Sequence, residues 1–177
     1  WIAERTIQMT KKKHAPKTYL NHPNQWKLKA LLEELFIDPD PDHITEELTG
    51  FLKKYPIPID DFPMLEGTYS RTILLRSDNG YEAMAARWSP GTVSSIHGHP
   101  EFALIIVTKG RLVVDCYKKH NDRLEKTGSE FLTESQFFSD VGQAGTFDNH
   151  IHGVQTDEET LSIHISSDDA SKGETFE

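Results

Sequence analysis

The sequence predicts a mainly β protein, an antiparallel barrel or sandwich that follows an N-terminal α-helical segment. Two observations support this prediction. Apolar residues recur at helical spacing before about residue 60, and at a period nearer to two after residue 65. The later apolar segments are short, and turn-forming residues separate them. Many short strands with frequent turns are typical of antiparallel sandwiches and barrels.

Two amphipathic helices are expected first. Residues 24–36 carry one broad apolar stripe, with Asn24 as the expected N-cap and the prolines at 39 and 41 as the stop. Residues 44–55 carry a similar stripe that also ends before two prolines, which cannot continue a helix. We interpret both stripes as core contacts with the rest of the domain.

Eight strands are expected after the helices. Turn signals such as Asp78-Asn79-Gly80 and Lys109-Gly110 separate them. The expected strands are 69–76, 81–89, 93–99, 102–108, 111–119, 130–138, 145–156 and 160–166. We therefore divide the 177 residues into a helical segment packed on the barrel (1–60), the barrel itself (61–170) and a polar tail (171–177).

Composition argues against several function classes. The net charge is −9, and the nearest thing to a basic stripe is Lys11-Lys12-Lys13, so we expect no nucleic-acid partner. No apolar run reaches about eighteen residues, and the start lacks the apolar stretch of a secretory signal. Cys116 is the single cysteine, which excludes an intrachain disulfide and fits a reducing compartment. We expect a cytoplasmic protein without membrane partners, either a monomer or a weak homo-oligomer.

Histidines mark a candidate metal site. His97 and His99 alternate on one expected strand, so both imidazoles point to the same face. His152, on another expected strand, is positioned to supply a third nitrogen. Three neutral nitrogen ligands with open coordination positions describe a reactive metal site rather than a closed structural one.

Two further side chains are candidates near this site. His150 lies two residues before His152 and would face the same side of a regular strand. We expect it to line the barrel mouth or contact a substrate, with a fourth metal ligand as the second interpretation. Glu101 lies two residues after His99 and would face the same side of a regular strand, so it is a weaker candidate for a carboxylate near the metal.

The spacing around the histidines resembles the first motif of the cupin superfamily, whose fold is an antiparallel jelly-roll barrel. Gly91, His97, His99 and Gly110 fall at motif positions, whereas Ala103 occupies the position of the motif's glutamate. Since alanine cannot bind a metal, the resemblance implies a site of three histidines.

Four segments between residues 69 and 166 also resemble thiol dioxygenases, the cupin family of cysteine dioxygenase, in their order and rough spacing. They are GTYSRT, RWSPGTVSSIHGH, IHGVQ and LSIHIS. The resemblance implies a non-heme Fe(II) enzyme. It would oxidise a small carboxylate-bearing thiol, of the cysteine or 3-mercaptopropionate type, to its sulfinate with O2.

The resemblance also implies roles for individual residues. The three histidines would hold Fe(II), with Mn, Ni or Zn as alternative metals. Arg71 would bind the substrate carboxylate and Tyr69 would flank it, while Ser162 and His164 would form an outer relay. Taken without the family, Arg71 equally fits a surface ion pair, His164 a core histidine, and Tyr69 ordinary packing.

The chain departs from the family at the end of this relay. Ser166 stands where the family has a tyrosine, and it is too short to reach the place of a phenol, so water, another tyrosine such as Tyr81, or nothing replaces it. Cys116 lies on a later strand, so no crosslinked Cys-Tyr cofactor is expected. Two other functions stay open: a different metal-dependent cupin enzyme that cleaves carbon–carbon bonds or isomerises its substrate, and a non-catalytic ligand-binding cupin.

Overall fold

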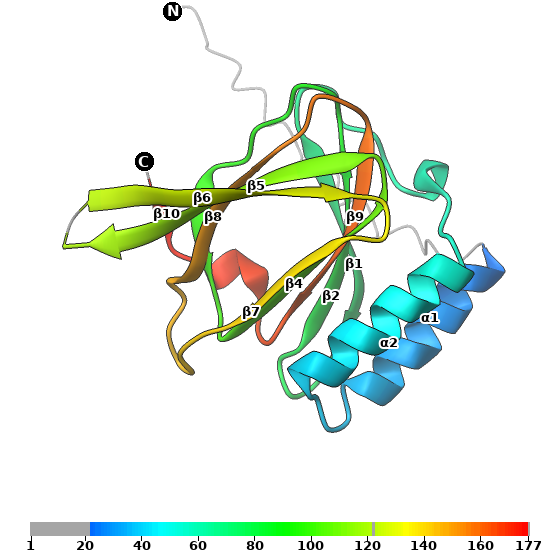
Figure 1. Cartoon of the computed structure of the whole chain (residues 1–177). Coiled ribbons are helices and arrows are strands. Elements are labelled where there is room, and N and C mark those ends of the chain that lie inside the picture. The colour runs from blue at the N-terminus through cyan, green and yellow to red at the C-terminus, as the bar shows by residue number, and fades with distance from the viewer. Residues whose placement is uncertain (1–21, 122, 177) are drawn as a thin grey trace, which may run out of the picture.

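The computed structural model describes residues 22–121 and 123–176. Ten strands form two antiparallel five-stranded sheets, and two helices pack on one side of the barrel (Figure 1). The predicted fold class, an antiparallel jelly-roll barrel with an N-terminal helical segment, is confirmed. The basic run at residues 11–13 and the start of the chain lie outside the described residues. No helix among the described residues is long and apolar enough to cross a membrane.

The elements follow one another in a simple order. The helices are α1 (Pro23–Leu35) and α2 (Pro41–Lys54), followed by the 3-10 helix η1 (Ile59–Asp61). The strands are β1 (Tyr69–Arg76), β2 (Glu82–Trp88), β3 (Ile96–His99), β4 (Phe102–Lys109), β5 (Arg111–His120), β6 (Arg123–Thr133), β7 (Phe137–Val141), β8 (Asn149–Gln155), β9 (Thr160–Ser166) and β10 (Thr175–Phe176), with the 3-10 helix η2 (Ala170–Lys172) before β10. One sheet has the order β1-β2-β9-β4-β7 and the other β10-β3-β8-β5-β6.

Both helices begin at a proline, which suits the first helical position because proline lacks the N–H that would have no partner within the helix there. His22 caps α1, where its Nδ1 accepts a hydrogen bond from the Asn24 N–H at 3.2 Å. Asp40 caps α2, where its carboxylate accepts from the His43 N–H at 2.8 Å. The expected cap at Asn24 is therefore wrong by two residues, and Pro41 starts the second helix rather than ending the first.

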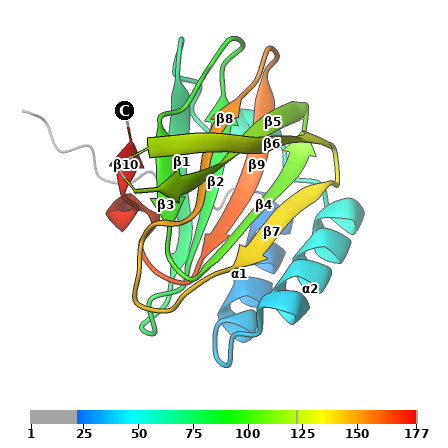
Figure 2. The same cartoon turned by 60° about the vertical axis from the view of Figure 1, so that its left-hand side comes forward.

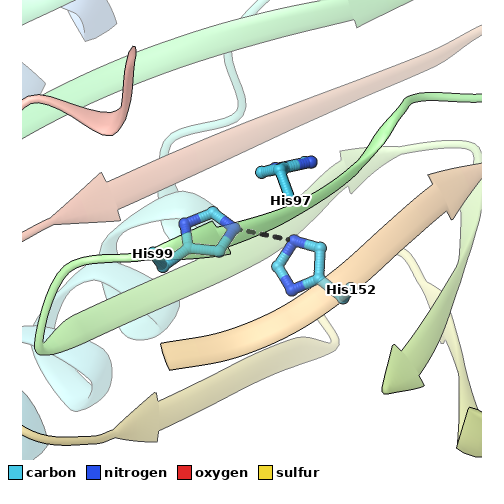
Figure 3. A group of neighbouring side chains, drawn as sticks. All are labelled: His97, His99 and His152. Atoms are coloured by element: carbon cyan, nitrogen blue, oxygen red, sulfur yellow. Dashed lines mark hydrogen bonds between the residues drawn. The ribbon is translucent and has the colours of Figure 1, made fainter. Parts of the chain in front are cut away.

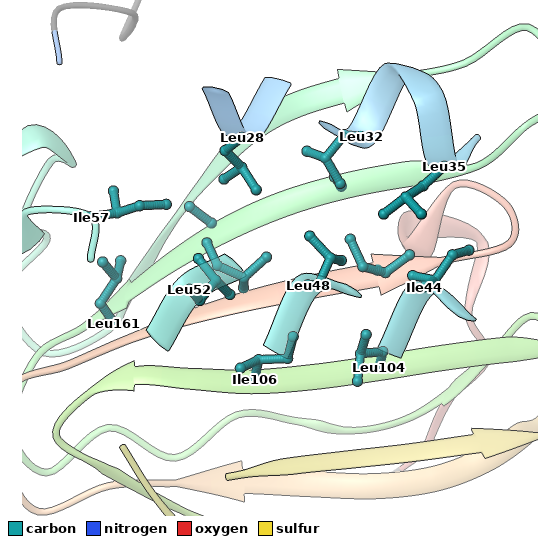
Figure 4. Packing of buried hydrophobic residues seen from close by; sticks show 14 of the residues in the cluster. Leu28, Leu32, Leu35, Ile44, Leu48, Leu52, Ile57, Leu104, Ile106 and Leu161 are labelled. Atoms are coloured by element: carbon teal, nitrogen blue, oxygen red, sulfur yellow. The ribbon is translucent and has the colours of Figure 1, made fainter. Parts of the chain in front are cut away.

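The apolar stripes of the helices pack against the outer face of β2, β4 and β9 (Figure 4). This cluster includes Leu28, Leu32, Leu35, Ile44, Leu48, Leu52, Leu104, Ile106, Leu161 and Ile163. Each fully buried Leu or Ile contributes about 1.5–3 kcal/mol relative to exposure. Arg87 on β2 adds polar contacts, since its guanidinium donates to the Phe62 carbonyl at 2.7 Å and pairs with Glu159. The helical segment is thus attached to the side of the barrel away from its interior.

A second apolar cluster fills the space between the two sheets. Its buried members are Met84, Ala86, Trp88, Ile105, Val107, Leu112, Val114, Leu132 and Val154. β2 and β4 carry one cluster on each face, so they are buried on both sides and read as nearly continuous apolar runs, whereas the face of β9 opposite the helices carries polar side chains. The polar side chains described below lie beside this inner cluster.

The expected strands 93–99 and 145–156 begin later than expected, at Ile96 and Asn149, and two other expected segments differ more from the structure. The expected strand 130–138 is wrong, because β6 ends at Thr133 and a turn with Ser135 at φ 67° leads into β7. The expected polar tail is also wrong in part, because η2 reaches into it and β10 pairs with β3. Figure 2 shows this C-terminal segment in red beside β3. The tail therefore closes one edge of the second sheet instead of leaving the barrel.

Candidate metal centre

The three predicted ligands converge in the barrel. His97 on β3 lies directly opposite His152 on β8 in the sheet register. The Nε2 atoms of His99 and His152 are 3.0 Å apart, and one nitrogen from each of the three rings lies within 4.8 Å of the others (Figure 3). His97, His99 and His152 could therefore hold one metal ion together.

Gly98 allows this arrangement by leaving room for two neighbouring segments. A Cβ added there would lie 2.5 Å from the Phe147 carbonyl oxygen, which is too close for any side chain. The Gly98 N–H also donates a hydrogen bond to the Glu174 carbonyl at 2.7 Å. The backbone between the two histidines is thus held between the C-terminal segment and the loop before β8.

The environment keeps the imidazoles neutral. Burial lowers the pKa of His97, and burial followed by the neighbouring histidines lowers the pKa of His99 and His152 well below its usual range. Neutral imidazole is the form that binds a metal. These three rings can therefore offer lone pairs to a cation at physiological pH.

The hydrogen-bond partners of the rings also fit a metal. His97 Nδ1 lies 2.8 Å from the Ser95 carbonyl oxygen and donates to it, which directs its Nε2 lone pair away from that bond. The Nδ1 atoms of His99 and His152 are buried without a hydrogen-bond partner among the described residues. Their Nε2 atoms lie within hydrogen-bond distance of each other, so a cation held by both rings through Nε2 would replace that contact.

A cavity of about 230 Å³ opens beside the three histidines. Its lining includes Tyr69, Arg71, Trp88, Ala103, His164, Ser166, Ala170, Ser171, Gly173 and Thr175. Ala103, at the position where the cupin motif has glutamate, thus borders the cavity without offering a ligand. The predicted substrate residues Tyr69 and Arg71 and the predicted relay residue His164 meet the metal ligands here, although β1 and β9 are far from β3 in sequence.

The expected relay pair forms a hydrogen-bonded chain with one residue that sequence reasoning gave no role. Trp88 Nε1 donates to Ser162 Oγ at 2.9 Å, and Ser162 Oγ lies 2.8 Å from His164 Nε2. Since the indole can only donate, the serine proton is available for His164 Nε2. In the tautomer whose Nε2 accepts from Ser162, His164 carries its own proton on Nδ1.

Acid should destabilise the metal-free protein partly through His164. Burial, followed by the charges of His97 and Arg71, lowers its pKa from 6.5 to about 3. The unfolded chain binds this proton below about pH 6.5 and the folded chain does not, so stability is complete above that pH and falls as the pH drops toward 3. The loss is at most about 1.4 kcal/mol per pKa unit.

Urea unfolding of the metal-free protein at several pH values from about 7 to 4 measures this slope. His164→Gln keeps a polar side chain but cannot protonate, so we expect a shallower slope for this variant. Equal slopes in both proteins would contradict the assignment to His164.

Arg71 and Tyr69 form one wall of the cavity. Arg71 Nε donates to Met84 Sδ at 2.9 Å, and its Nη2 lies 3.9 Å from Glu82 Oε1. The Tyr69 ring stacks on Trp88 with 4.2 Å between ring centroids. Glu82 is 1 % exposed and was not recognised from the sequence. Its only local signal was a charged residue at the start of a mostly apolar strand.

His150 does not follow the expected geometry. Its backbone has φ 49°, so the strand is irregular here and its alternation does not carry the side chain to the face of His152. Its Nε2 lies 2.8 Å from the Glu101 carbonyl oxygen and its Nδ1 lies 3.0 Å from the Asp140 carboxylate. The described residues that line the cavity do not include His150. The Glu101 side chain itself is exposed.

Two other side chains are placed differently from their expected surroundings. Tyr81 packs against Phe36 and Phe102 in the cluster beneath the helices, so it does not replace the relay tyrosine beside Ser166. Cys116 lies directly opposite His152 on the neighbouring strand β5, closer to the histidines than its sequence position suggested. Burial raises the pKa of the Cys116 thiol.

Fold and site together define an antiparallel two-sheet barrel with a candidate three-histidine metal centre. No protein-family model matches the chain, and no curated protein sequence matches it. Among solved structures, it is similar to a cupin superfamily protein of Desulfitobacterium hafniense at 14% identity, covering 64% of this chain and 91% of that chain with a TM-score of 0.49.

Two further solved structures are similar to this chain. A Klebsiella pneumoniae protein with a double-stranded β-helix domain is 17% identical over 68% of this chain and 96% of that chain, with a TM-score of 0.48. A DMSP lyase of Ruegeria pomeroyi is 13% identical over 57% of this chain and 47% of that chain, with a TM-score of 0.43. These likenesses concern the fold alone.

Proposed function

We propose that this protein is a non-heme Fe(II) thiol dioxygenase acting on a small carboxylate-bearing thiol of the cysteine or 3-mercaptopropionate type. The thiol and O2 would combine to a sulfinic acid, so both oxygen atoms enter the product and no further reductant is needed. One observation carries the proposal: a single cavity contains three neutral imidazoles and the guanidinium of Arg71. The sequence resemblance to thiol dioxygenases supports the choice of substrate.

Iron(II) held by the three histidines would supply the positions at which thiolate and O2 meet. Manganese, nickel or zinc are the alternative metals. Arg71 would bind the substrate carboxylate through the planar fork of its guanidinium, which suits bidentate pairing. This contact would fix the distance between the carboxylate and the sulfur, so that the sulfur is placed at the histidines.

The remaining cavity residues would orient the ligand and keep water out. Ser162, which accepts from Trp88, would donate to His164 Nε2, and the His164 Nδ1–H would then be available to the bound ligand. Tyr69 covers Trp88 on the Arg71 side of the cavity. The C-terminal segment covers another side with Ala170, Ser171 and Gly173.

Oxygen uptake tests the proposal directly. Protein reconstituted with Fe(II) without O2 is mixed with cysteine, 3-mercaptopropionate, mercaptosuccinate or cysteamine, and then exposed to O2. We expect one O2 consumed per sulfinate formed with at least one carboxylate thiol, and slower uptake with cysteamine, which lacks a carboxylate. Absence of uptake with every thiol would refute the proposal. Stoichiometric zinc or nickel in protein purified without added metal would favour a different cupin chemistry.

A further inference from the structure

Glu82 is a buried carboxylate that the proposed reaction does not use. It is the first residue of β2 and lies opposite Ser166 in the sheet register, at the position where β9 ends. Only 1 % of its surface is exposed. A carboxylate this deeply buried requires cationic partners, because an unpaired buried charge is strongly destabilising.

Two arginines of β1 approach this carboxylate unequally. Arg76 donates from both Nε and Nη2 to Glu82 Oε2, with the Nε contact at 2.9 Å. Glu82 Oε1 has no hydrogen-bond partner among the described residues, and Arg71 Nη2 lies 3.9 Å from it. One carboxylate oxygen is therefore taken by Arg76, while the other remains free to attract the guanidinium that lines the cavity.

The same ion pair reaches the segment that covers the cavity. Arg76 Nη2 lies 3.6 Å from the carboxylate of Asp169. Asp169 caps η2 by accepting a hydrogen bond from the Ser171 N–H at 2.8 Å, and Ser171 lines the cavity. The charges of this network alternate from Arg71 through Glu82 and Arg76 to Asp169, so they balance without a ligand.

We propose that Glu82 is a positioning residue that holds the Arg71 guanidinium in the cavity wall and so makes the cavity selective for carboxylate ligands. Glu82 does not itself line the cavity, and Arg71 is the neighbour through which it would act on a carboxylate ligand. Arg71 Nε is occupied by Met84 Sδ and Nη2 is turned to Glu82, which leaves the other edge of the guanidinium for an incoming carboxylate. The inference rests on the proposed function only in that Arg71 binds the substrate.

Glu82→Gln separates this role from simple packing. Arg76 requires an acceptor at the Oε2 position, so the glutamine carbonyl will face Arg76 and the amide NH2 will take the position of Oε1. The NH2 group is a donor and would face the donors of Arg71. The guanidinium then loses its partner on that side and gains a mismatched neighbour, which should displace it from the cavity wall.

Ligand binding to zinc-loaded protein measures the effect without O2 chemistry, because zinc has no redox activity. NMR titration with 3-mercaptopropionate, followed at the Arg71 Nε–H signal, gives the Kd, and cysteamine serves as the ligand without a carboxylate. We expect Glu82→Gln to weaken 3-mercaptopropionate at least about tenfold, ~1.4 kcal/mol, and to leave cysteamine unchanged. Asp157→Asn, which removes the partner of the exposed Arg111, is the matched control and should change neither.

A double-mutant cycle tests whether Glu82 acts through Arg71. In an Arg71→Gln background, Glu82→Gln should not weaken 3-mercaptopropionate further. Glu82→Asp keeps the charge but moves it away from Arg71, so it should weaken 3-mercaptopropionate binding less than Glu82→Gln does. This variant also tests the proposal if Glu82→Gln does not fold.

Each outcome separates this proposal from the proposed function. Unchanged or tighter carboxylate binding in both Glu82 variants would overturn the positioning role, as would a wild type that binds no 3-mercaptopropionate. If O2 uptake fails with every thiol while Glu82→Gln still weakens carboxylate binding, the oxygenase proposal falls and the positioning role stands.

Discussion

Replacing His99 by alanine is expected to abolish stable metal binding, because it removes one of three ligands. Mutating a group that only orients a metal ligand weakens metal affinity by up to about 100-fold, so the loss here should be well above that. The His99 Nε2 atom lies 3.0 Å from that of His152, and the His99 ring lies closer to each of the other two rings than they lie to each other. Its removal leaves two nitrogens and a buried space where the ring was. Two imidazoles cannot fill the coordination that three provide, so activity should be lost with the metal.

Equilibrium dialysis with Fe(II) or zinc, followed by metal analysis, measures this loss, and circular dichroism verifies the fold. Metal should also raise the melting temperature of the wild type but not of the variant, since only the folded wild type binds it. His120→Ala is the matched control, because His120 is an exposed histidine of β5 whose nearest charged partner is Glu125. A His99→Ala protein that still binds one metal as tightly as wild type would remove His99 from the ligand set.

Replacing Arg71 by methionine is expected to raise KM for carboxylate thiols roughly 10- to 100-fold, because a hydrogen bond to a charged group contributes ~1.5–3 kcal/mol. Methionine keeps much of the length of the side chain and removes the charge. The turnover of cysteamine should change little, since it offers no carboxylate to Arg71. Steady-state O2 uptake with 3-mercaptopropionate and cysteamine compares the two cases.

Arg111→Met is the control for removing an arginine, because Arg111 pairs with Asp157 on the surface and does not line this cavity among its described residues. We expect it to leave both substrates unaffected. Equal changes in KM for the carboxylate and the amine thiol in Arg71→Met would show that Arg71 shapes the cavity without binding the carboxylate.

Local patterns predicted the elements whose two faces differ in burial. The stripe at 44–55 was found because α2 is buried on one face and exposed on the other. The full extent of β6 was missed because most of its residues are exposed on both faces, so no alternation marks it. The pairing of β10 with β3 could not be foreseen, since a two-residue strand carries no period of its own.

The orientation of single side chains was harder to predict than the strands that carry them. His150 was expected to face His152 because a regular strand alternates, but one residue with positive φ turned it toward Asp140. Glu82 was overlooked because its partners come from β1. Such partners depend on register and rotamers, which no short stretch of sequence contains.

By itself the sequence determined the barrel class and the three candidate ligands. His97 and His99 share a face through strand alternation, and their spacing matches a known motif. The tertiary structure decided what surrounds them. It placed Arg71, His164 and the C-terminal segment at one cavity, and it connected Arg71 to Glu82 and Arg76. The physical reason is that alternation is a property of neighbouring residues, whereas the pairing of buried charges depends on strands brought together only by the folded barrel.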